Sequence, residues 1–327
     1  HTWGWDDLYP MQREAIDAAM VGRDTLLVLP TGGGKSLCFQ VPPLVLGGLA
    51  VVVSPLIALM KDQVDGLQEV GVAAACLHGE QETELQDEVV AAADRGELRL
   101  LYVTPERLVS PSFLSRLARW GPRWIAVDEA HCISQWGHDF RPEYRRLAEV
   151  RAALPGASML ACTATATVQV RKDILLQLGL RDPLVLVGSI DRPNLTYRVT
   201  PRTKGRQQVR EALSRHRGQA AIVYCATRKQ TESTATALKA DGFSAAAYHA
   251  GLDRATRTRV QDDFASERVD VVAATVAFGM GIDRSDVRCI VHTSMPDSLE
   301  RYQQETGRAG RDGLPAECVM FFSGGDA

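Results

Sequence analysis

Short apolar runs alternate with longer, amphipathic stretches along this chain. In the first half the apolar runs are Leu26 to Leu29, Ala50 to Val53, Leu100 to Val103, Trp124 to Val127 and Met159 to Cys162. Runs of this length are typical of buried strands, and the stretches between them are long enough to form helices. The alternation therefore predicts an α/β fold, in which a mainly parallel sheet is flanked by helices.

The pattern is interrupted between Leu180 and Pro193, where glycine and proline residues accumulate. A second series of apolar runs follows: Ala221 to Tyr224, Ala245 to Tyr248, Val269 to Ala274, Cys289 to Val291 and Cys318 to Phe322. A cluster of glycine and proline residues between two such series is typical of a domain boundary. A chain of 327 residues also exceeds the size at which one hydrophobic core keeps growing. We therefore expect two tandem domains, at residues 1–190 and 191–327.

Composition is that of a soluble globular protein, with 45% hydrophobic residues interrupted throughout by charge. No apolar stretch is long enough to cross a bilayer, and no secretory signal is present. The seven cysteines are scattered without a C-x-x-C pair, which argues against a disulfide framework and against a zinc site. We expect a cytoplasmic protein that is monomeric and makes no contact with a membrane.

The net charge of −3 excludes only a globally basic protein. A nucleic-acid backbone needs a local positive track, and the segment from Arg198 to Arg217 is rich in arginine. A solvated helix face would explain the same segment equally well.

A glycine-rich segment, L-P-T-G-G-G-K-S, follows the first apolar run and precedes a stretch that can form a helix. Glycine lets phosphate oxygens approach the backbone, and N–H groups at the start of a helix can bind them. Alone, such a segment is sometimes only a tight connection between a strand and a helix. The candidate nucleotide ligands are Thr31, Gly32, Gly33, Gly34, Lys35 and Ser36.

An acidic pair, Asp128 and Glu129, ends the apolar run Trp124 to Val127. Acidic pairs are common on solvated surfaces, but a pair at the end of a buried strand needs compensation for its desolvated charge, and a metal ion provides it. Together with the glycine-rich segment, the pair indicates a nucleoside triphosphate site. Lys35 would contact the β and γ phosphates, Ser36 and Asp128 would hold Mg²⁺, and Glu129 is the candidate base for the attacking water.

Two arginines, Arg308 and Arg311, follow a predicted helix in the segment Q-E-T-G-R-A-G-R. They are candidate γ-phosphate contacts, although arginine is most often plain surface charge. With these motifs in place, the chain resembles the RecQ family of superfamily-two DNA helicases from Trp3 to about Phe322, in the order of the family's motor core. The resemblance implies two RecA-like domains with the nucleotide bound between them.

The resemblance assigns roles to further residues. Gln12 matches the glutamine that contacts adenine, and Trp5 replaces an aromatic that stacks nearby, so ATP is the expected nucleotide. The family usually has Phe-Arg-Pro-Gly-Gln where this chain has Leu8 to Gln12, and the missing arginine removes part of the base contact. Arg308 and Arg311 take the arginine-finger positions, and Arg311 is the favoured one.

The segment from Cys132 to Pro142, C-I-S-Q-W-G-H-D-F-R-P, resembles the aromatic-rich loop of RecQ proteins. Trp136 and Phe140 would stack on single-stranded bases, and His138 and Arg141 lie between and beside them. The alternative is a small satellite core beneath a loop. Further DNA-binding or coupling positions implied by the resemblance are Ser54, Thr163, Thr165, Arg228, His249 and Thr275.

These motifs predict an ATP- and Mg²⁺-dependent DNA helicase motor, with no zinc in this chain. The resemblance implies 3′ to 5′ movement on single-stranded DNA, unwinding of duplex and forked DNA, and a nucleoid-associated role in repair or recombination. One alternative is an RNA helicase of the same superfamily. Another is a nucleotide-gated DNA-binding switch that does not unwind. Because RecQ proteins commonly continue into a four-cysteine zinc region and a winged helix, we expect a motor fragment, beginning at His1 and ending at Ala327.

Overall fold

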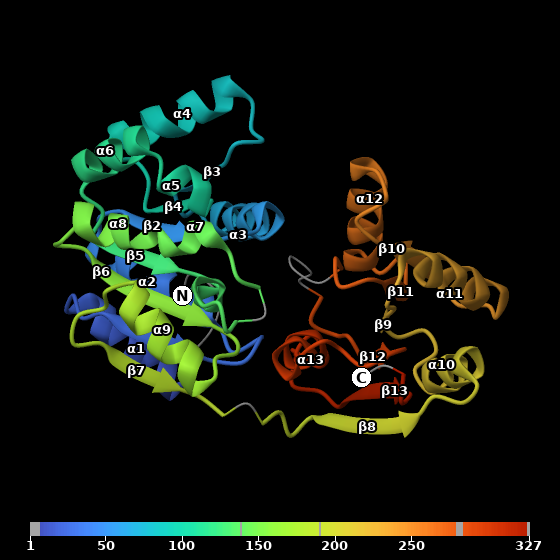
Figure 1. The fold of residues 1–327 in the computed structure, drawn as a ribbon. Coiled ribbons are helices and arrows are strands. Elements are labelled where there is room, and N and C mark those ends of the chain that lie inside the picture. The colour runs from blue at the N-terminus through green and yellow to red at the C-terminus, as the bar shows by residue number, and fades with distance from the viewer. Residues whose placement is uncertain (1–6, 138, 190, 279–283, 326–327) are drawn as a thin grey trace. The chain divides into compact units, whose positions relative to one another are not determined.

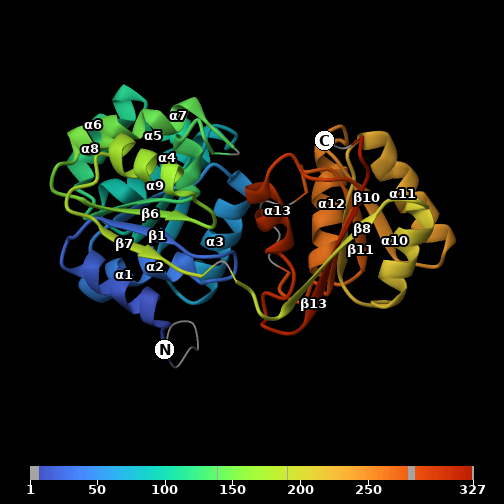
Figure 2. The ribbon, with the colours of Figure 1, turned by 60° about the horizontal axis from the view of Figure 1, so that its bottom comes forward.

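The computed structural model describes residues 7–137, 139–189, 191–278 and 284–325. The chain forms two compact units, His1–Ile190 and Asp191–Ala327. Each unit is an α/β layer structure of its own (Figures 1 and 2), and each is described by itself.

The first unit contains a sheet of seven strands in the order β3-β4-β2-β5-β6-β1-β7. Every neighbouring pair is parallel, so all the carboxyl ends lie at one edge. The strands are β1 (Thr25–Val28), β2 (Ala50–Val53), β3 (Ala74–Leu77), β4 (Leu100–Val103), β5 (Trp124–Val127), β6 (Ser158–Thr163) and β7 (Leu184–Val187).

Helices cover both faces of this sheet, because successive strand residues point to opposite sides. Leu27 and Val52 face a core shared with the first three helices, whereas Leu26 and Val51 face a core shared mainly with the later ones. The helices are α1 (Pro10–Met20), α2 (Lys35–Leu46), α3 (Ile57–Glu69), α4 (Thr83–Asp94), α5 (Pro105–Leu108), α6 (Pro111–Trp120), η1 (Ala130–Ile133), α7 (Pro142–Arg145), α8 (Leu147–Ala153) and α9 (Val168–Gln177).

The second unit contains a sheet of six strands in the order β10-β11-β9-β12-β13-β8, again with parallel neighbours. Helices α10 and α11 share a core with one face, and α12 packs on the other. The strands are β8 (Leu195–Pro201), β9 (Ala221–Tyr224), β10 (Ala245–Tyr248), β11 (Val271–Ala274), β12 (Cys289–His292) and β13 (Ala316–Phe322); the helices are α10 (Gly205–Ser214), α11 (Arg228–Ala240), α12 (Arg254–Ala265) and α13 (Leu299–Thr306).

The α/β fold class is confirmed, and every apolar run named from the sequence is a strand within a residue or two at each end. Three strands were missed. β3 is largely alanine, β7 is bounded by Pro183 and Gly188 within the supposed interruption, and β8 is an edge strand with mostly exposed residues. Their apolar signal is weak because all three lie at sheet edges and are partly exposed.

A buried carboxylate organises the amino edge of the first sheet. Asp24, just before β1, forms an ion pair with Arg151 of α8, and both side chains are less than 10% exposed. The same carboxylate accepts hydrogen bonds from the backbone N–H of Met159, at 2.8 Å, and of Arg181, at 2.7 Å. Four segments of the first unit therefore meet at one charged group.

No helix among the described residues has the length and apolarity needed to span a bilayer.

Candidate nucleotide site and its coupled loops

The predicted nucleotide motifs gather at the carboxyl edge of the first sheet. The glycine-rich loop follows β1, Asp128 follows β5, and Thr163 ends β6. These three strands are neighbours in the order β5-β6-β1, so the loops after them start side by side. Open α/β sheets bind ligands at this edge.

The glycine-rich loop has a backbone that only glycine fits well. Gly32 and Gly34 have positive φ angles of 81° and 69°. A Cβ atom on Gly34 would lie 2.1 Å from Nε2 of Gln12, and one on Gly33 would lie 2.9 Å from the carbonyl oxygen of Pro30. Side chains here would both strain the backbone and fill the space that a phosphate group needs.

Lys35 and Gln12 hold this loop in shape. Nζ of Lys35, the first residue of α2, donates to the carbonyl oxygens of Leu29, at 3.0 Å, and Pro30, at 3.2 Å. Nε2 of Gln12 donates to the carbonyls of Gly33 and Gly34, and its Oε1 accepts from the N–H of Tyr9. Gln12 therefore joins the start of α1 to the loop, a contact that the sequence did not predict.

Asp128 is a half-buried acid beside a second acid. Burial and the negative charge of Glu129 raise the pKa of Asp128 to about 7, while the charge of Lys35 opposes the rise. Oδ1 of Asp128 accepts the backbone N–H of Glu129, at 3.0 Å. Glu129 has a left-handed backbone, with φ 48°, which is uncommon for a residue with a side chain.

A chain of polar contacts leads from Glu129 to the end of β6. Oε2 of Glu129 lies 3.3 Å from Nδ1 of His131, which in turn lies 2.9 Å from Oγ1 of Thr163. The Thr163 hydroxyl donates to the carbonyl of Thr165, at 3.0 Å. His131 is buried and was not among the predicted site residues, although its position in Asp-Glu-Ala-His was a signal that could have identified it.

These residues fit a magnesium-bound triphosphate. Two neighbouring carboxylates with little exposure need a cation, and oxygen ligands are those that Mg²⁺ prefers. Ser36 is the second residue of α2, directly after Lys35, where its hydroxyl is available as a further oxygen ligand. A bound Mg²⁺ would neutralise phosphate charge and hold the triphosphate in position.

The aromatic-rich loop is a surface feature. Trp136 is 73% exposed, and Phe140 is half-buried beneath the guanidinium of Arg145, 5.3 Å from the ring centre. Gly137 permits a tight turn here, since a Cβ atom on it would lie 2.5 Å from the carbonyl oxygen of His131. His138 lies outside the described residues, as does Trp5. An exposed tryptophan does not fit the alternative of a satellite core.

Contacts tie this loop to its surroundings. The Ser134 hydroxyl donates to Asp173 of α9, at 2.7 Å, and the N–H of Arg141 donates to the carbonyl of Cys132, at 2.8 Å. Nη1 of Arg141 donates to the carbonyl of Pro55, 3.2 Å away and next to Ser54. Ser54 is buried after β2, and its hydroxyl has no hydrogen-bond partner among the described residues.

The second unit brings several predicted DNA-binding residues together at the carboxyl edge of its own sheet. Arg228 begins α11, and His249 follows β10. A Cβ atom on Gly251 would lie 2.9 Å from Nη1 of Arg228 and 3.2 Å from Nδ1 of His249, so glycine permits this packing. Thr275 follows β11, and its N–H donates to the carbonyl of Tyr248, at 3.2 Å.

The two candidate finger arginines differ in environment. Arg308 is 7% exposed, and its charge opposes the rise that burial causes in the pKa of the Tyr224 hydroxyl. Arg311 is only partly buried. Both follow α13, as the sequence predicted, but Arg308 is anchored within its own unit.

The basic segment predicted from the sequence is not one continuous track. Arg217 packs over the ring of Phe243, and Arg202 donates to the carbonyl of Thr293, at 2.6 Å. Arg198 and Arg215 both bind the carboxylate of Glu317. Much of this positive charge is therefore used within the second unit.

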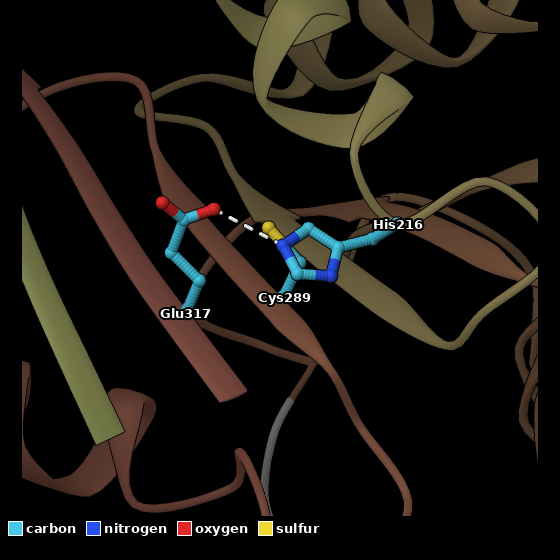
Figure 3. A group of neighbouring side chains, drawn as sticks. All are labelled: His216, Cys289 and Glu317. Atoms are coloured by element: carbon cyan, nitrogen blue, oxygen red, sulfur yellow. Dashed lines mark hydrogen bonds and ion pairs between the residues drawn. The ribbon is translucent and has the colours of Figure 1, made fainter. Parts of the chain in front are cut away.

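Glu317 belongs to one group of described residues whose atoms are close enough to hold a metal ion: His216, Cys289 and Glu317 (Figure 3). Nε2 of His216 lies 3.0 Å from Oε2 of Glu317. The two arginine partners already compensate the carboxylate, and burial raises the pKa of the Cys289 thiol, which disfavours the thiolate that zinc requires. The chemistry is that of an ion-pair cluster at the amino edge of the sheet.

Comparisons with known proteins place these features in a family. The DEAD/DEAH box helicase model matches residues 9–174, and the helicase conserved C-terminal domain model matches residues 204–313. The ATP-dependent DNA helicase RecQ of Haemophilus influenzae is 48% identical over 325 residues, which cover 99% of this chain and 52% of that protein. The chain belongs to the RecQ family of DEAD/DEAH box helicases. It spans about half the length of the curated RecQ relatives from Haemophilus influenzae and Pasteurella multocida.

Solved structures support the same fold at lower identity. The helicase Lhr of Mycobacterium smegmatis, bound to single-stranded DNA and AMP-PNP, matches with a TM-score of 0.77 and 21% identity over 98% of this chain and 46% of Lhr. Mss116p, bound to single-stranded RNA and AMP-PNP, matches with a TM-score of 0.80 and 17% identity over 98% of this chain and 70% of that one. Both units are thus RecA-like, and this fold is found in proteins bound to either nucleic acid.

Proposed function

We propose that this RecQ chain is the motor of an ATP-dependent DNA helicase that moves 3′ to 5′ on single-stranded DNA and unwinds duplex and forked DNA in repair or recombination. Because the proposed substrate is DNA, we expect this protein to act at the nucleoid. The observation that carries the proposal is the conjunction, within one unit, of a glycine-rich loop, a half-buried acidic pair and an aromatic-rich loop with an exposed tryptophan. The first residue of that loop, Cys132, donates its N–H to the carbonyl of Glu129, at 2.9 Å.

In the proposed cycle the glycine-rich loop and Lys35 bind the phosphates, and Ser36 and Asp128 hold Mg²⁺. Glu129 orients and deprotonates the attacking water. The second unit supplies Arg311 to the developing charge on the γ-phosphate. Each base-pair step costs about 1.4 kcal/mol of stacking, which is within the reach of one nucleotide-driven step.

DNA contacts are proposed for both units. Trp136 and Phe140 would stack on bases, which contributes about 1–3 kcal/mol for each stacked base. Arg228, His249 and Thr275 would follow the strand at the carboxyl edge of the second sheet. Gln12 would contact adenine as well as the loop, and Thr163 and Thr165 would relay the state of the nucleotide through His131.

ATP turnover measured at equal salt with single-stranded DNA, with single-stranded RNA and with no polynucleotide tests the proposal. We expect strong activation by DNA alone, and about a thousandfold loss of kcat in Lys35→Ala. Single-stranded DNA should still bind, because the change removes the phosphate contact and the two loop hydrogen bonds of Lys35 but leaves the proposed DNA contacts in place. Constant salt matters because binding to a phosphate backbone weakens steeply with ionic strength. Substantial turnover in Lys35→Ala would contradict the assignment.

The same assay separates the alternatives. Activation by RNA would identify an RNA helicase. Mss116p, which was solved with single-stranded RNA bound, has the same fold. A tailed duplex distinguishes the third function: DNA-stimulated turnover without release of the displaced strand would identify a nucleotide-gated switch.

A further inference from the structure

The backbone at Glu129 needs an explanation beyond the residues already described. Its φ of 48° lies in the left-handed region, which is unfavourable for a residue with a side chain. Such a conformation persists only where the surrounding contacts hold it in place. The groups that bond the peptide between Asp128 and Glu129 therefore determine where the Glu129 carboxylate points.

Both polar groups of that peptide are engaged. Its N–H donates to Oδ1 of Asp128, at 3.0 Å, and its carbonyl oxygen accepts the hydroxyl of Tyr144, at 2.9 Å. A flip of this peptide would carry Glu129 out of the left-handed region, and it would break both bonds. Tyr144 is fully buried, and burial raises the pKa of its hydroxyl further above the usual value, so the group remains a donor at all physiological pH.

Tyr144 lies at the end of the aromatic-rich loop. It is on the single turn of α7, which starts at Pro142, where the loop from Cys132 to Pro142 ends. The N–H of Tyr144 donates to the carbonyl of Arg141, at 3.0 Å, and the N–H of Arg141 donates to Cys132, at 2.8 Å. A displacement of the loop on binding a strand would therefore move the hydroxyl that holds the Glu129 peptide.

We propose that Tyr144 is a positioning residue, which fixes the backbone of Glu129 through the Asp128 carbonyl and links the aromatic-rich loop to ATP hydrolysis. This inference rests on the proposed function, since it assumes that Glu129 acts on the attacking water and that the loop contacts DNA. The hydroxyl acts through the peptide and not on the nucleotide. It should therefore affect kcat and not the KM for ATP.

Tyr144→Phe removes the hydroxyl and keeps the ring. We expect kcat in the presence of single-stranded DNA to fall about 3- to 10-fold, the value of one buried neutral hydrogen bond, with the KM for ATP unchanged. The matched control is Tyr102→Phe. Tyr102 is 2% exposed, and its hydroxyl accepts a hydrogen bond from Gln40, at 3.0 Å, so the same atom is lost from the same unit without touching the Glu129 peptide. This control should keep its kcat.

A double-mutant cycle tests the link to the loop. If Tyr144 relays the state of the loop, Tyr144→Phe and Trp136→Ala together should reduce DNA stimulation much less than the product of their separate effects. Independent effects would overturn the relay, and wild-type kcat in Tyr144→Phe, or an equal loss in Tyr102→Phe, would overturn the positioning role. Absence of DNA-stimulated turnover in the unmutated chain would instead refute the proposed function, on which this inference depends.

Discussion

The carboxyl edge of the first sheet carries the phosphate loop and the acids Asp128 and Glu129, whereas the same edge of the second sheet carries Arg228 and His249. The described part of the second unit has no glycine-rich segment ending in Gly-Lys-Ser. One RecA-like unit thus has the groups that we propose bind and cleave a triphosphate, and the other has mainly donors suited to anions. The two units share a fold but differ in the charge of the groups at this edge of the sheet.

The amino edges of the two sheets are alike instead. Each has a carboxylate with little exposure, Asp24 in the first unit and Glu317 in the second, held by arginines and, for Asp24, by backbone N–H groups. Both carboxylates have their ion-pair and hydrogen-bond partners within their own unit. From this contrast we infer that function in this RecQ chain is concentrated in the loops at one edge of each sheet, and that the opposite edge serves stability.

The largest expected effect concerns the arginines of the second unit. Arg311→Ala should lower kcat by about 10³–10⁵-fold, because an arginine at the γ-phosphate stabilises charge that develops only in the transition state. Arg308→Ala is the matched variant. Because Arg308 is buried inside its own unit, near Tyr224, Arg308→Ala should lower the melting temperature of that unit with a smaller loss of kcat. Steady-state ATP turnover measures kcat, and thermal unfolding measures the melting temperature. A greater loss of kcat in Arg308→Ala than in Arg311→Ala would make Arg308 the γ-phosphate contact instead.

The next effect is on stability. Asp24→Asn should destabilise the first unit by about 3–5 kcal/mol, because it leaves Arg151 as a buried charge without its partner. All five tryptophans lie in the first unit, so their fluorescence during urea unfolding follows this unit specifically. Asp182→Asn is the control, since Asp182 is exposed and its ion pair with Arg23 spans 3.9 Å. Equal stability of both variants would contradict a structural role for the amino edge.

The sequence predicts the parts of this molecule whose characteristic residues are consecutive along the chain. Apolar runs such as Ala50 to Val53 mark buried strands, and the glycine-rich segment and the acidic pair are each continuous in sequence. Contacts between distant segments are not predictable in this way. The hydroxyl of Tyr144 meets the Asp128 carbonyl, and Gln12 meets Gly33, only after the chain has folded. The arginine-rich segment left two interpretations open, because nothing in the sequence shows that Arg198 and Arg215 bind a carboxylate that is far away along the chain.

The smallest effect is the pH dependence of the Glu317 cluster. Burial acts to raise the pKa of Glu317, but hydrogen bonds from His216, Arg215 and Arg198 outweigh it, so the pKa is lowered in the folded protein. The stabilisation is therefore complete above the unfolded pKa of about 4.3 and is lost as the pH falls through the folded pKa. At pH 7, Glu317→Gln should cost about 1–2 kcal/mol, a modest value because Arg198 and Arg215 are themselves half exposed. Hydrogen exchange of the β12 and β13 amides measures this difference in the second unit, and it should shrink below pH 4. A difference that stays constant down to pH 3 would mean that the carboxylate's charge is not what stabilises this edge.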